Sequence, residues 1–431
     1  MTETVLLVGG GGREHAIARA VEASADAVLY ACGSNRNPGI DALGEGFESI
    51  EETETAAVVE YAASVGATLA VVGPEVALEA GVADALDDAG VYAFGPRAAE
   101  ARIETDKAFQ REFMADHDVP GCPDYAVFED AEAAADYVRE YDGDLAIKPR
   151  GLTGGKGVRV TGDQITAAEG VEYVLESDHD AFVIEERLVG EEFTVQAFVA
   201  NGQYRVSPAV QDHKRAYEGD EGPNTGGMGS YSDATFELPF MTEADYTAAV
   251  GIIDAVVDAI PGYKGILYGQ FMLTADGPKV VEFNARFGDP EAMNTLPVLE
   301  TDFVSILRAA RDGEDLPELA FSNEATVCKY AVPDGYPTDP RAGAEVTIDP
   351  DSAGDALLFY ASVDAREDGV YTTTSRSFAV VGRADTITGA EAVAADAVER
   401  TGTGGLRVRH DVGTAELLQA RIDHMNRLRE E

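Results

Sequence analysis

A group of polar residues with strand spacing lies between Lys279 and Glu291, in the segment KVVEFNARFGDPE. Side chains alternate in direction along an extended chain, so we expect Glu282, Asn284 and Arg286 to project from one face of a strand. A carboxylate and an amide oxygen side by side suit a hard cation such as Mg²⁺, which keeps water or phosphate oxygens in its other positions. Because apolar residues alternate with them, the segment predicts a half-buried strand with a metal site and not an exposed polar edge.

Lysine is scarce in this chain, and some of its lysines lie where a phosphate could bind. Lys107 falls in the first turn of a helix that we expect Thr105 to cap, and a cation there is unfavourable for the helix dipole unless an anion is bound nearby. A solvated Lys107 is the alternative. Lys148 ends the apolar segment 145–148, which we expect to be a strand.

The loop GLTGGKG at 151–157 combines glycines with Lys156. A P-loop has four residues between its first glycine and the Gly-Lys pair, continues with Ser or Thr and leads into a helix. This loop is shorter, continues with Gly157 and leads into a predicted strand. We therefore expect a hairpin flap whose backbone N–H groups close over phosphates. A merely flexible turn would not explain why two of the few lysines lie at 148 and 156.

The segment QDHKRAYEGDEGPNTGGMGS at 211–230 is rich in glycine and has no helical or strand periodicity, which predicts an active-site loop. It begins with Asp212, His213, Lys214 and Arg215, which together are too polar for a packed core. His213 is interpreted either as a metal ligand or as a solvated loop residue.

The first hundred residues alternate between short apolar strands and helices. A strand at 5–8, the glycines at 9–12 and an amphipathic helix form a Rossmann-like unit. Two features argue against NAD: Glu14 occupies the third glycine position of the dinucleotide pattern, and the second strand ends in Cys32, not in an acidic ribose ligand. The strand at 69–72 leads into Glu75, a candidate ligand for a substrate hydroxyl.

The rest of the chain predicts a mixed α/β protein with a small α+β region at its end. Before residue 325 we expect strands at 182–185, 193–199 and 265–273, a hairpin turn at Asn201 and Gly202, and helices at 242–260 and 301–311. After it we expect strands at 357–363, 370–373 and 378–381, a helix at 390–400 and a basic segment at 407–409.

With 431 residues, the chain is long enough for two to four domains. It contains no apolar segment long enough to cross a bilayer, and its first residues, MTETVLLVGG, carry an acid where a signal peptide carries basic residues. Cys32, Cys122 and Cys328 are far apart and lack metal-ligand spacing, so we expect free thiols. These features predict a cytoplasmic protein without a membrane partner.

The charge is strongly acidic: 79 Asp and Glu against 32 Lys and Arg give a formal net charge of −47. Such a surface repels duplex DNA or RNA, so we expect no nucleic-acid partner. The acidic residues are distributed along the whole chain. This pattern is typical of a halophilic protein, because concentrated salt screens the repulsion among its carboxylates.

Taken in order, the motifs resemble those of ATP-grasp ligases, and more closely the phosphoribosylamine-glycine ligase (glycinamide ribonucleotide synthetase) family. The resemblance extends over nearly the whole chain and is carried by GGREHA at 11–16, GPE at 73–75, DKAF at 106–109, GGKG at 154–157, QDHKR at 211–215, GPNTGGMG at 222–229, EFNARFGDPE at 282–291 and RHDVG at 409–413. It implies a Rossmann-like N-terminal domain at 1–102, an ATP-grasp domain at 103–324 with a lid subdomain near 120–190, and a C-terminal α+β cap at 325–431.

The resemblance also implies a reaction. The family joins glycine to phosphoribosylamine in purine biosynthesis, with ATP as co-substrate and Mg²⁺ or Mn²⁺ as the metal. The glycine carboxylate attacks the γ-phosphate, and the amine then attacks the resulting glycyl phosphate. Positioning and charge neutralisation suffice for both steps, which agrees with the absence of an evident Ser-His or Cys-His pair in the sequence. We expect a monomer whose partners are small molecules.

By position, the resemblance assigns roles to individual residues. The ATP phosphates would be bound by Lys107, Lys148, Gly154, Gly155 and Lys156, the adenine by Glu185, Glu186 and Leu188, and the ribose by Glu192. The metals would be bound by Glu282 and Asn284, and the catalytic residues would be Arg286, Lys156, Asp212 and Lys214. The other substrates would be bound by Gly11, Gly12, Glu75, Asp212, Lys214, Asn224, Thr225, Gly226, Arg286, Asp289 and Arg409.

Two other functions remain open at this point. Another ATP-grasp carboxylate-amine ligase, or a carboxylase, would share the ATP-binding residues but lack the QDHKR and GPNTGGMG motifs. A nucleotide-sensing protein would have no need of Asn284 and Arg286 beside Glu282. The chain also departs from the family at Gly10, where asparagine is usual, and in SNRNPG at 34–39, where a GNAGT pattern is common.

The acidic composition generates a prediction about salt. Because added salt screens repulsion among surface carboxylates, we expect the melting temperature to rise as KCl is raised from millimolar to molar concentration. Scanning calorimetry across that range measures the effect. A melting temperature that stays flat or falls would contradict the adaptation to salt.

Overall fold

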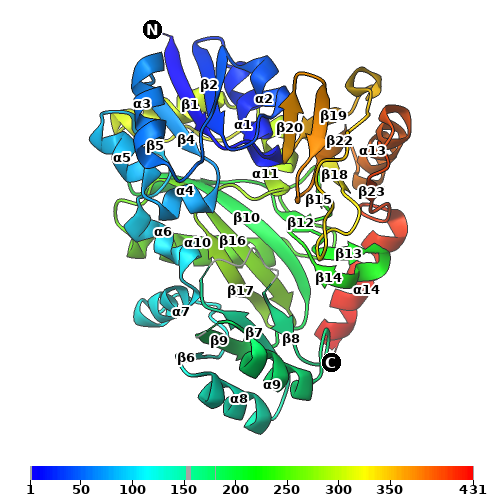
Figure 1. Cartoon of the computed structure of the whole chain (residues 1–431). Helices are drawn as coiled ribbons and strands as arrows, with labels where there is room; N and C mark the ends of the chain where they lie inside the picture. Colours follow the sequence, from blue (N-terminus) through cyan, green and yellow to red (C-terminus); the bar gives the residue numbers. More distant parts are fainter. Residues whose placement is uncertain (1, 152–156, 180, 431) are drawn as a thin grey trace.

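The computed structural model describes residues 2–151, 157–179 and 181–430. Figure 1 shows a parallel sheet at one end of the molecule, a long antiparallel sheet in the middle and a smaller sheet at the other end. The architecture is therefore mixed α/β, as predicted.

The N-terminal sheet has the strand order β3-β2-β1-β4-β5, and all its neighbouring strands are parallel. Its central strand is buried on both faces, which explains the unbroken apolar run from Val5 to Val8. The strands are β1 (Glu3–Val8), β2 (Ala27–Gly33), β3 (Gly46–Ser49), β4 (Leu69–Val72) and β5 (Tyr92–Phe94). The helices are α1 (Gly12–Glu22), α2 (Pro38–Leu43), α3 (Thr55–Val65), α4 (Glu75–Glu79), α5 (Val82–Asp88) and α6 (Ala98–Thr105).

The smaller sheet follows helix α7 (Lys107–Asp116) and has the order β6-β9-β7-β8, with antiparallel neighbours. It has a core of its own, in which Val138 and Val174 of its helices pack on Leu145, Ile147 and Phe182 of its strands. Its elements are β6 (Tyr125–Phe128), α8 (Ala131–Glu140), β7 (Leu145–Pro149), β8 (Arg159–Val160), α9 (Ala167–Glu176) and β9 (Phe182–Glu186).

The central sheet is antiparallel, with the order β17-β16-β10-β12-β15-β18-β22-β19 and with β11 and β23 at its sides. Its strands are β10 (Glu191–Ala200), β11 (Gln203–Val206), β12 (Val210–Asp212), β15 (Gly229–Ser232), β16 (Gly265–Thr274), β17 (Gly277–Asn284), β18 (Ala325–Val332), β19 (Leu357–Tyr360), β22 (Phe378–Ala384) and β23 (Arg407–Val408). The C-terminal strands therefore continue the central sheet, because β18 pairs with β15.

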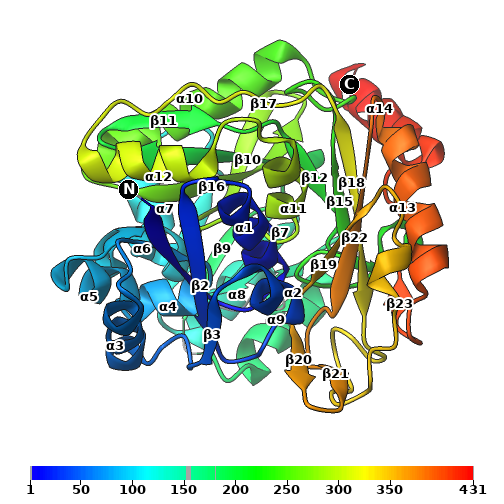
Figure 2. The ribbon, with the colours of Figure 1, turned by 90° about the horizontal axis from the view of Figure 1, so that it is seen from above.

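Helices cover this sheet, and two small hairpins project from it. The helices are α10 (Glu243–Ala259), α11 (Glu291–Thr295), α12 (Phe303–Asp312), α13 (Ile387–Thr401) and α14 (Ala415–Glu430), and the hairpin strands are β13 (Arg215–Tyr217), β14 (Glu221–Asn224), β20 (Val363–Arg366) and β21 (Gly369–Thr372). Figure 2 shows α13 and α14 beside β18 and β22, on the side away from the N-terminal strands. Among the described residues, no helix is long and apolar enough to cross a membrane.

The segment 211–230 is not the irregular loop that its sequence predicted. It forms β12, β13, β14 and β15, in which β13 pairs with β14 and β12 pairs with β15. Strands of three or four residues are too short to show periodicity in the sequence, and glycines between them hide the pattern further.

The predicted start of the lysine-bearing helix was wrong by one residue. Thr105 ends α6, and Asp106 caps α7 by accepting hydrogen bonds from the N–H groups of Ala108 and Phe109, both at 3.2 Å. Asp106 has an extended conformation between two abutting helices, which suits an aspartate cap.

Three further differences lie near the end of the chain. The strand predicted at 357–363 is divided into β19 and β20, because β19 pairs with β22 whereas β20 pairs with β21. Helix α14 was not predicted, and α13 begins three residues before the predicted start, at Ile387 rather than Ala390. The remaining predicted strands and helices are present, and Asn201 and Gly202 form the expected hairpin turn with positive φ.

Candidate active site

A cavity of about 370 Å³ lies where the three sheets meet. The N-terminal unit contributes Arg13 and Glu75, the small sheet contributes Lys148, the central sheet contributes Glu282, and the C-terminal region contributes Arg376. Every part of the fold is therefore needed to enclose it.

The predicted metal strand is β17, and it faces this cavity. Glu282 and Asn284 lie on one face of the strand, with Asn284 Nδ2 3.4 Å from Glu282 Oε1. The chain bulges just before them, between the pairs Phe271↔Val280 and Gln270↔Glu282. The bulge leaves Val281 outside the regular ladder, so the Val281 carbonyl turns towards other partners. The spacing of Glu282 and Asn284 along the strand is not disturbed.

The oxygen atoms of this strand fit a hard cation. Burial alone would raise the pKa of Glu282, but Lys214, Lys107 and Lys148 lower it to about 2, so the carboxylate is ionised. Within 2–151, 157–179 and 181–430, no group of three or more His, Cys, Asp or Glu side chains is placed to hold a metal. A cation at Glu282 and Asn284 would therefore take its other oxygens from phosphates or water.

Lys148 is fixed on β7 by a buried ion pair. Its Nζ lies 2.8 Å from Glu185 Oε2 and donates to the carbonyl of Val281 at 2.9 Å. Arg111 of α7 forms the other half of the cluster, with 2.7 and 2.9 Å contacts to the two oxygens of Glu185. Burial would raise the pKa of Glu185, but Arg111 and Lys148 hold it below its usual value.

Lys107 also reaches the cavity, from the first turn of α7. Its Nζ donates to the carbonyl of Gly151, and burial lowers its pKa although Glu282 and Glu104 act in the opposite direction. The Lys107 side chain is therefore half-buried in the cavity wall, and its role in binding an anion stays a prediction.

The segment predicted to bind adenine lies at one end of the cavity. The carboxylate of Glu185 is occupied by the Arg111 and Lys148 ion pairs, and the N–H groups of Glu186 and Arg187 donate to backbone carbonyls. The predicted contact with an adenine edge therefore depends mainly on the chain at Leu188, which also lines the cavity.

Arg286, which follows the end of β17, is held between two acids. Its Nη2 lies 2.8 Å from Glu104 Oε1, and its Nε lies 3.5 Å from Glu75 Oε2. Burial raises the pKa of Glu104 to about 7, although Arg286 opposes the shift. Arg286 thus stays charged and faces the cavity. Glu104 was not predicted as a site residue, because it lies inside an ordinary helical sequence.

A second group of polar side chains lines the cavity beside Glu282, whose partner on the neighbouring strand β16 is Gln270. Lys214 donates to Gln270 Oε1 at 2.6 Å, and Gln270 in turn donates to Glu192 Oε2 at 2.7 Å. Burial raises the pKa of Asp212, and the neighbouring carboxylate of Glu291 raises it further. Among the described residues, Asp212 Oδ1 has no hydrogen-bond partner, so it is free to accept a proton or a substrate N–H.

Arg376 closes this end of the cavity from the C-terminal region. Its Nη2 lies 3.0 Å from Asp289 Oδ2, and its Nη1 donates to the carbonyls of Gly226 and Gly227. Arg376 was not predicted as a site residue, because it is far along the chain from the motifs that it contacts.

Most of the predicted site residues meet in this one cavity. Its lining includes Glu75, Lys107, Lys148, Glu185, Glu186, Leu188, Glu192, Asp212, Lys214, Asn224, Thr225, Gly226, Glu282, Asn284, Arg286 and Asp289. It also includes residues that the sequence did not single out, among them Arg13, Glu104, Tyr268, Gln270, Met272 and Arg376. The predicted Gly154, Gly155 and Lys156 lie outside the described residues.

Gly11, Gly12 and Arg409 are predicted ligands that the described cavity lining does not contain. Gly11 caps α1, and a Cβ at Gly12 would lie 2.3 Å from the hydroxyl of Tyr330, so close packing explains that glycine. Arg409 is only 1% exposed and is paired with Asp220 and Asp411. The structure therefore gives no support to Arg409 as a substrate ligand.

Neither interpretation of His213 fits the structure. The side chain is 2% exposed, so it is not a solvated loop residue. Its ring packs against Tyr231, and neither ring nitrogen has a hydrogen-bond partner among the described residues. Burial lowers its pKa to about 3, so the ring is neutral, and no metal-ligand group includes it within the part of the chain that the structure describes.

Comparison with known proteins agrees with this geometry. Residues 105–292 match the family model described as the phosphoribosylglycinamide synthetase ATP-grasp (A) domain, residues 3–104 match the N domain, and residues 326–415 match the C domain. The fold and the cavity thus define an ATP-grasp enzyme, a ligase that depends on ATP. The chain belongs to the phosphoribosylglycinamide synthetase family.

Individual relatives are similar along their whole length. The chain is 54% identical to the phosphoribosylamine–glycine ligase of Methanosarcina barkeri, with 99% of both chains covered, and 53% identical to that of Methanosarcina acetivorans, with 100% and 98% covered. The crystal structure of the Thermotoga maritima phosphoribosylamine–glycine ligase is similar with a TM-score of 0.79 at 25% identity, covering 95% of this chain and 99% of that one. A biotin carboxylase from Campylobacter jejuni, 14% identical with a TM-score of 0.74, shares the fold.

The position of Lys148 generates a prediction. We expect Lys148→Ala to raise the Kd for ATP and ADP by about tenfold or more, because the variant loses a buried cation that faces the phosphates. Isothermal titration well below the melting temperature measures both constants. Lys264→Ala is the matched control, since Lys264 is a half-buried lysine that pairs with Asp87, and neither residue is in the described cavity lining. Equal nucleotide affinity in the two variants would exclude this role of Lys148.

Proposed function

We propose that this chain joins glycine to phosphoribosylamine at the expense of ATP, giving glycinamide ribonucleotide, ADP and phosphate in purine biosynthesis. The main support is that one cavity combines buried lysines for phosphates, the ionised Glu282 beside Asn284, and a second polar group at Asp212 and Lys214. Phosphoribosylamine–glycine ligases that match the chain end to end support the choice of substrates.

Two nucleophilic attacks would take place in this cavity. The carboxylate of glycine attacks the γ-phosphorus of ATP, and the bond to the leaving ADP oxygen breaks, which gives glycyl phosphate. The amine of phosphoribosylamine then attacks the glycyl carbonyl carbon, phosphate leaves, and the amine loses a proton. Both steps need alignment and charge neutralisation more than a side-chain nucleophile.

The chain's own cations would stabilise the charge that moves during phosphoryl transfer. Lys107 and Lys148 would hold the phosphates of ATP, and Arg286 would face the transferred phosphoryl group. Glu282 and Asn284 would hold Mg²⁺ or Mn²⁺, which supplies further neutralisation of phosphate charge when bound. Lys156 would add a cation from the flap.

The remaining predicted ligands divide between the ends of the cavity. Leu188 and Glu186 would contact the adenine and Glu192 the ribose. The acceptor end, with Asp212 and Lys214, would hold glycine and phosphoribosylamine, assisted by Glu75, Asn224, Thr225, Gly226 and Asp289. Asp212 Oδ1 has no hydrogen-bond partner among the described residues, so in its ionised form this carboxylate would take up the proton that the attacking amine loses.

The proposal extends to the organisation and setting of the enzyme. The domains would be 1–102, 103–324 with a lid near 120–190, and 325–431. A monomer is supported by the cavity, which one chain lines from Arg13 to Arg376. The enzyme would work in the cytoplasm of a salt-rich cell, without nucleic-acid or membrane partners. The net charge of −47 supports this setting.

The metal assignment can be tested by Glu282→Gln. The change keeps the size of the side chain and removes the charge, so we expect turnover at saturating Mg²⁺ to fall at least about 100-fold while the melting temperature stays similar. Binding of Mn²⁺ with ADP, followed by electron paramagnetic resonance, should weaken as well. Glu318→Gln, which alters an acid whose side chain is 89% exposed, is the control. Near-normal turnover of Glu282→Gln would contradict the assignment.

The substrates can be tested by ADP release. We expect sustained release only when ATP, glycine and freshly made phosphoribosylamine are all present, because glycyl phosphate is consumed only by the amine. Mixtures without glycine, without the amine, or with alanine in place of glycine are the controls. Equal rates with and without phosphoribosylamine would contradict the proposed reaction.

A further inference from the structure

The acceptor end of the cavity is connected to the C-terminal helix by a small hairpin. The cavity hairpin, as we name it, is β13 and β14 with their turn, residues 215–224. Lys214 and Thr225 flank it and line the cavity. Figure 1 shows α14 running beside this hairpin, although about 200 residues separate them in sequence. The contacts of the hairpin with α14 and with the segment before it involve arginines that are not in the described cavity lining.

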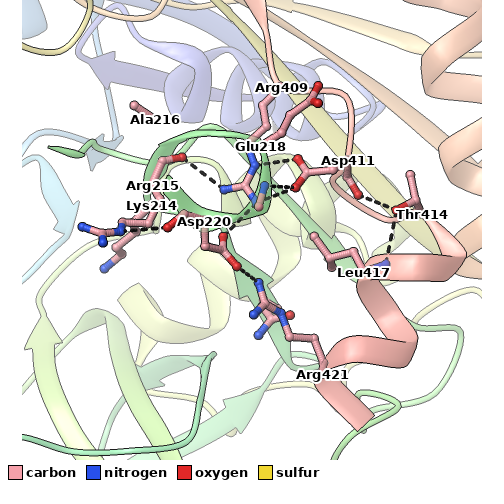
Figure 3. Close-up of polar contacts among 12 residues, drawn as sticks. Lys214, Arg215, Ala216, Glu218, Asp220, Arg409, Asp411, Thr414, Leu417 and Arg421 are labelled. Atoms are coloured by element: carbon pink, nitrogen blue, oxygen red, sulfur yellow. Dashed lines mark hydrogen bonds and ion pairs between the residues drawn. The ribbon is translucent and has the colours of Figure 1, made fainter. Parts of the chain in front are cut away.

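Asp220, in the turn of the cavity hairpin, receives two arginines. Arg409 Nη2 lies 2.8 Å from Asp220 Oδ1, and Arg421 of α14 donates to the other oxygen. Asp220 has a φ of 57°, a conformation that costs a non-glycine residue free energy and persists where its surroundings impose it. The hairpin turn is therefore held in place by ion pairs from outside the hairpin (Figure 3).

Arg409 and its neighbour Asp411 bind the hairpin at further points. Arg409 donates to the carbonyl of Arg215 at 3.1 Å, and Asp411 accepts from the N–H of Gly219 at 3.0 Å. Asp411 also orients Arg409 through contacts of 2.6 and 2.8 Å. The start of β13 and the hairpin turn are thus fixed to one C-terminal segment, whose arginine is almost fully buried.

Helix α14 also contacts the back of the strands that face the cavity. Arg421 Nε lies 3.3 Å from Glu191 Oε2, and His424 Nδ1 lies 2.7 Å from Glu191 Oε1. The next residue, Glu192, points the opposite way and lines the cavity, as strand alternation requires.

At its other end the cavity hairpin holds Lys214. The N–H and the hydroxyl of Thr225 donate to the carbonyl of Lys214 at 2.7 and 2.8 Å, and Lys214 Nζ donates to Gln270. A shift of the hairpin would therefore move the backbone that carries Lys214.

We propose that Arg409 and Arg421 are positioning residues, which act through Asp220 to hold the cavity hairpin so that Lys214 and Thr225 face glycine and phosphoribosylamine. This role rests on the proposed function. The adenine end lies on β9 and the chain that follows it, outside the hairpin. Lys214 also lies beside Glu282, through its contact with Gln270, so the positioning affects the acceptor end and the transferred phosphoryl group more than the binding of ADP, which lacks that group.

The test compares Asp220→Ala, Asp220→Asn and Arg429→Gln with the unaltered enzyme. Asparagine keeps the shape of aspartate and tolerates positive φ, whereas alanine removes the two carboxylate oxygens that pair with Arg409 and Arg421. Arg429 is the matched control, since it lies on the same helix but pairs with Asp245 of α10 at 2.6 Å, away from the hairpin. Each protein is assayed for kcat and for KM of glycine and phosphoribosylamine, for the Kd of ADP, and for melting temperature.

We expect Asp220→Ala to lower kcat/KM for glycine by about tenfold or more while the Kd for ADP changes less than about twofold. Asp220→Asn should lose less, and Arg429→Gln should keep the kcat/KM of the unaltered enzyme. A purely stabilising role would lower the melting temperature of Asp220→Ala and leave its kcat/KM unchanged, which would overturn the proposal. An equal loss of ADP affinity and of kcat/KM would overturn it too, because it indicates a general loosening of the cavity.

A failure of the proposed function is distinguishable from a failure of the positioning role. In the first case the unaltered enzyme already shows no ADP release that depends on both glycine and phosphoribosylamine. In the second case the unaltered enzyme is active with both substrates, and only the Asp220 variants depart from expectation.

Discussion

The buried carboxylate of Glu185, shared by Arg111 and Lys148, is the contact on which the geometry of the nucleotide end depends. Taking such charges out of water is costly, and the cost is offset only when the partners hold a fixed geometry. Arg111 comes from α7 and Lys148 from β7, and both also donate to the carbonyl of Val281 on β17. One carboxylate and one carbonyl therefore set the distance between the small sheet and β17.

The same ion pairs explain how a chain with a net charge of −47 can bind a polyphosphate. Repulsion from a uniformly acidic surface would oppose ATP. Lys107, Lys148, Lys214 and Arg286 instead gather around the ionised Glu282, each with acidic partners of its own. The cations are local and fixed, so a phosphate meets a neutralising environment whatever the total charge is.

The part of the site that could be predicted from the sequence depends on short-range geometry. Glu282 and Asn284 alternate on one strand, and the bulge that disturbs β17 lies before them, so their spacing stays regular. The segment 211–230 was misjudged, because its short strands are stabilised by pairing with distant segments and not by local periodicity.

Residues brought in by long-range contacts gave no signal in the sequence. Arg376 reaches Asp289 from the C-terminal region, and Glu104 reaches Arg286 from the end of α6. Arg409 is a different case: a recognisable motif predicts it as a substrate ligand, and in the structure it is paired with Asp220 and Asp411. A motif thus identified the residue without identifying its partner.

The sheet that continues from β15 into β18 limits how this molecule can open. Residues 229–232 and 326–329 are joined by backbone hydrogen bonds, so the central and C-terminal parts cannot rotate against each other without breaking that ladder. The small sheet, in contrast, has its own core and meets the rest through side-chain pairs, among them the Glu185 cluster, Arg150 with Asp106, and Asp163 with Arg215. A rigid-body motion of the small sheet would therefore exchange side-chain contacts and leave every strand ladder intact.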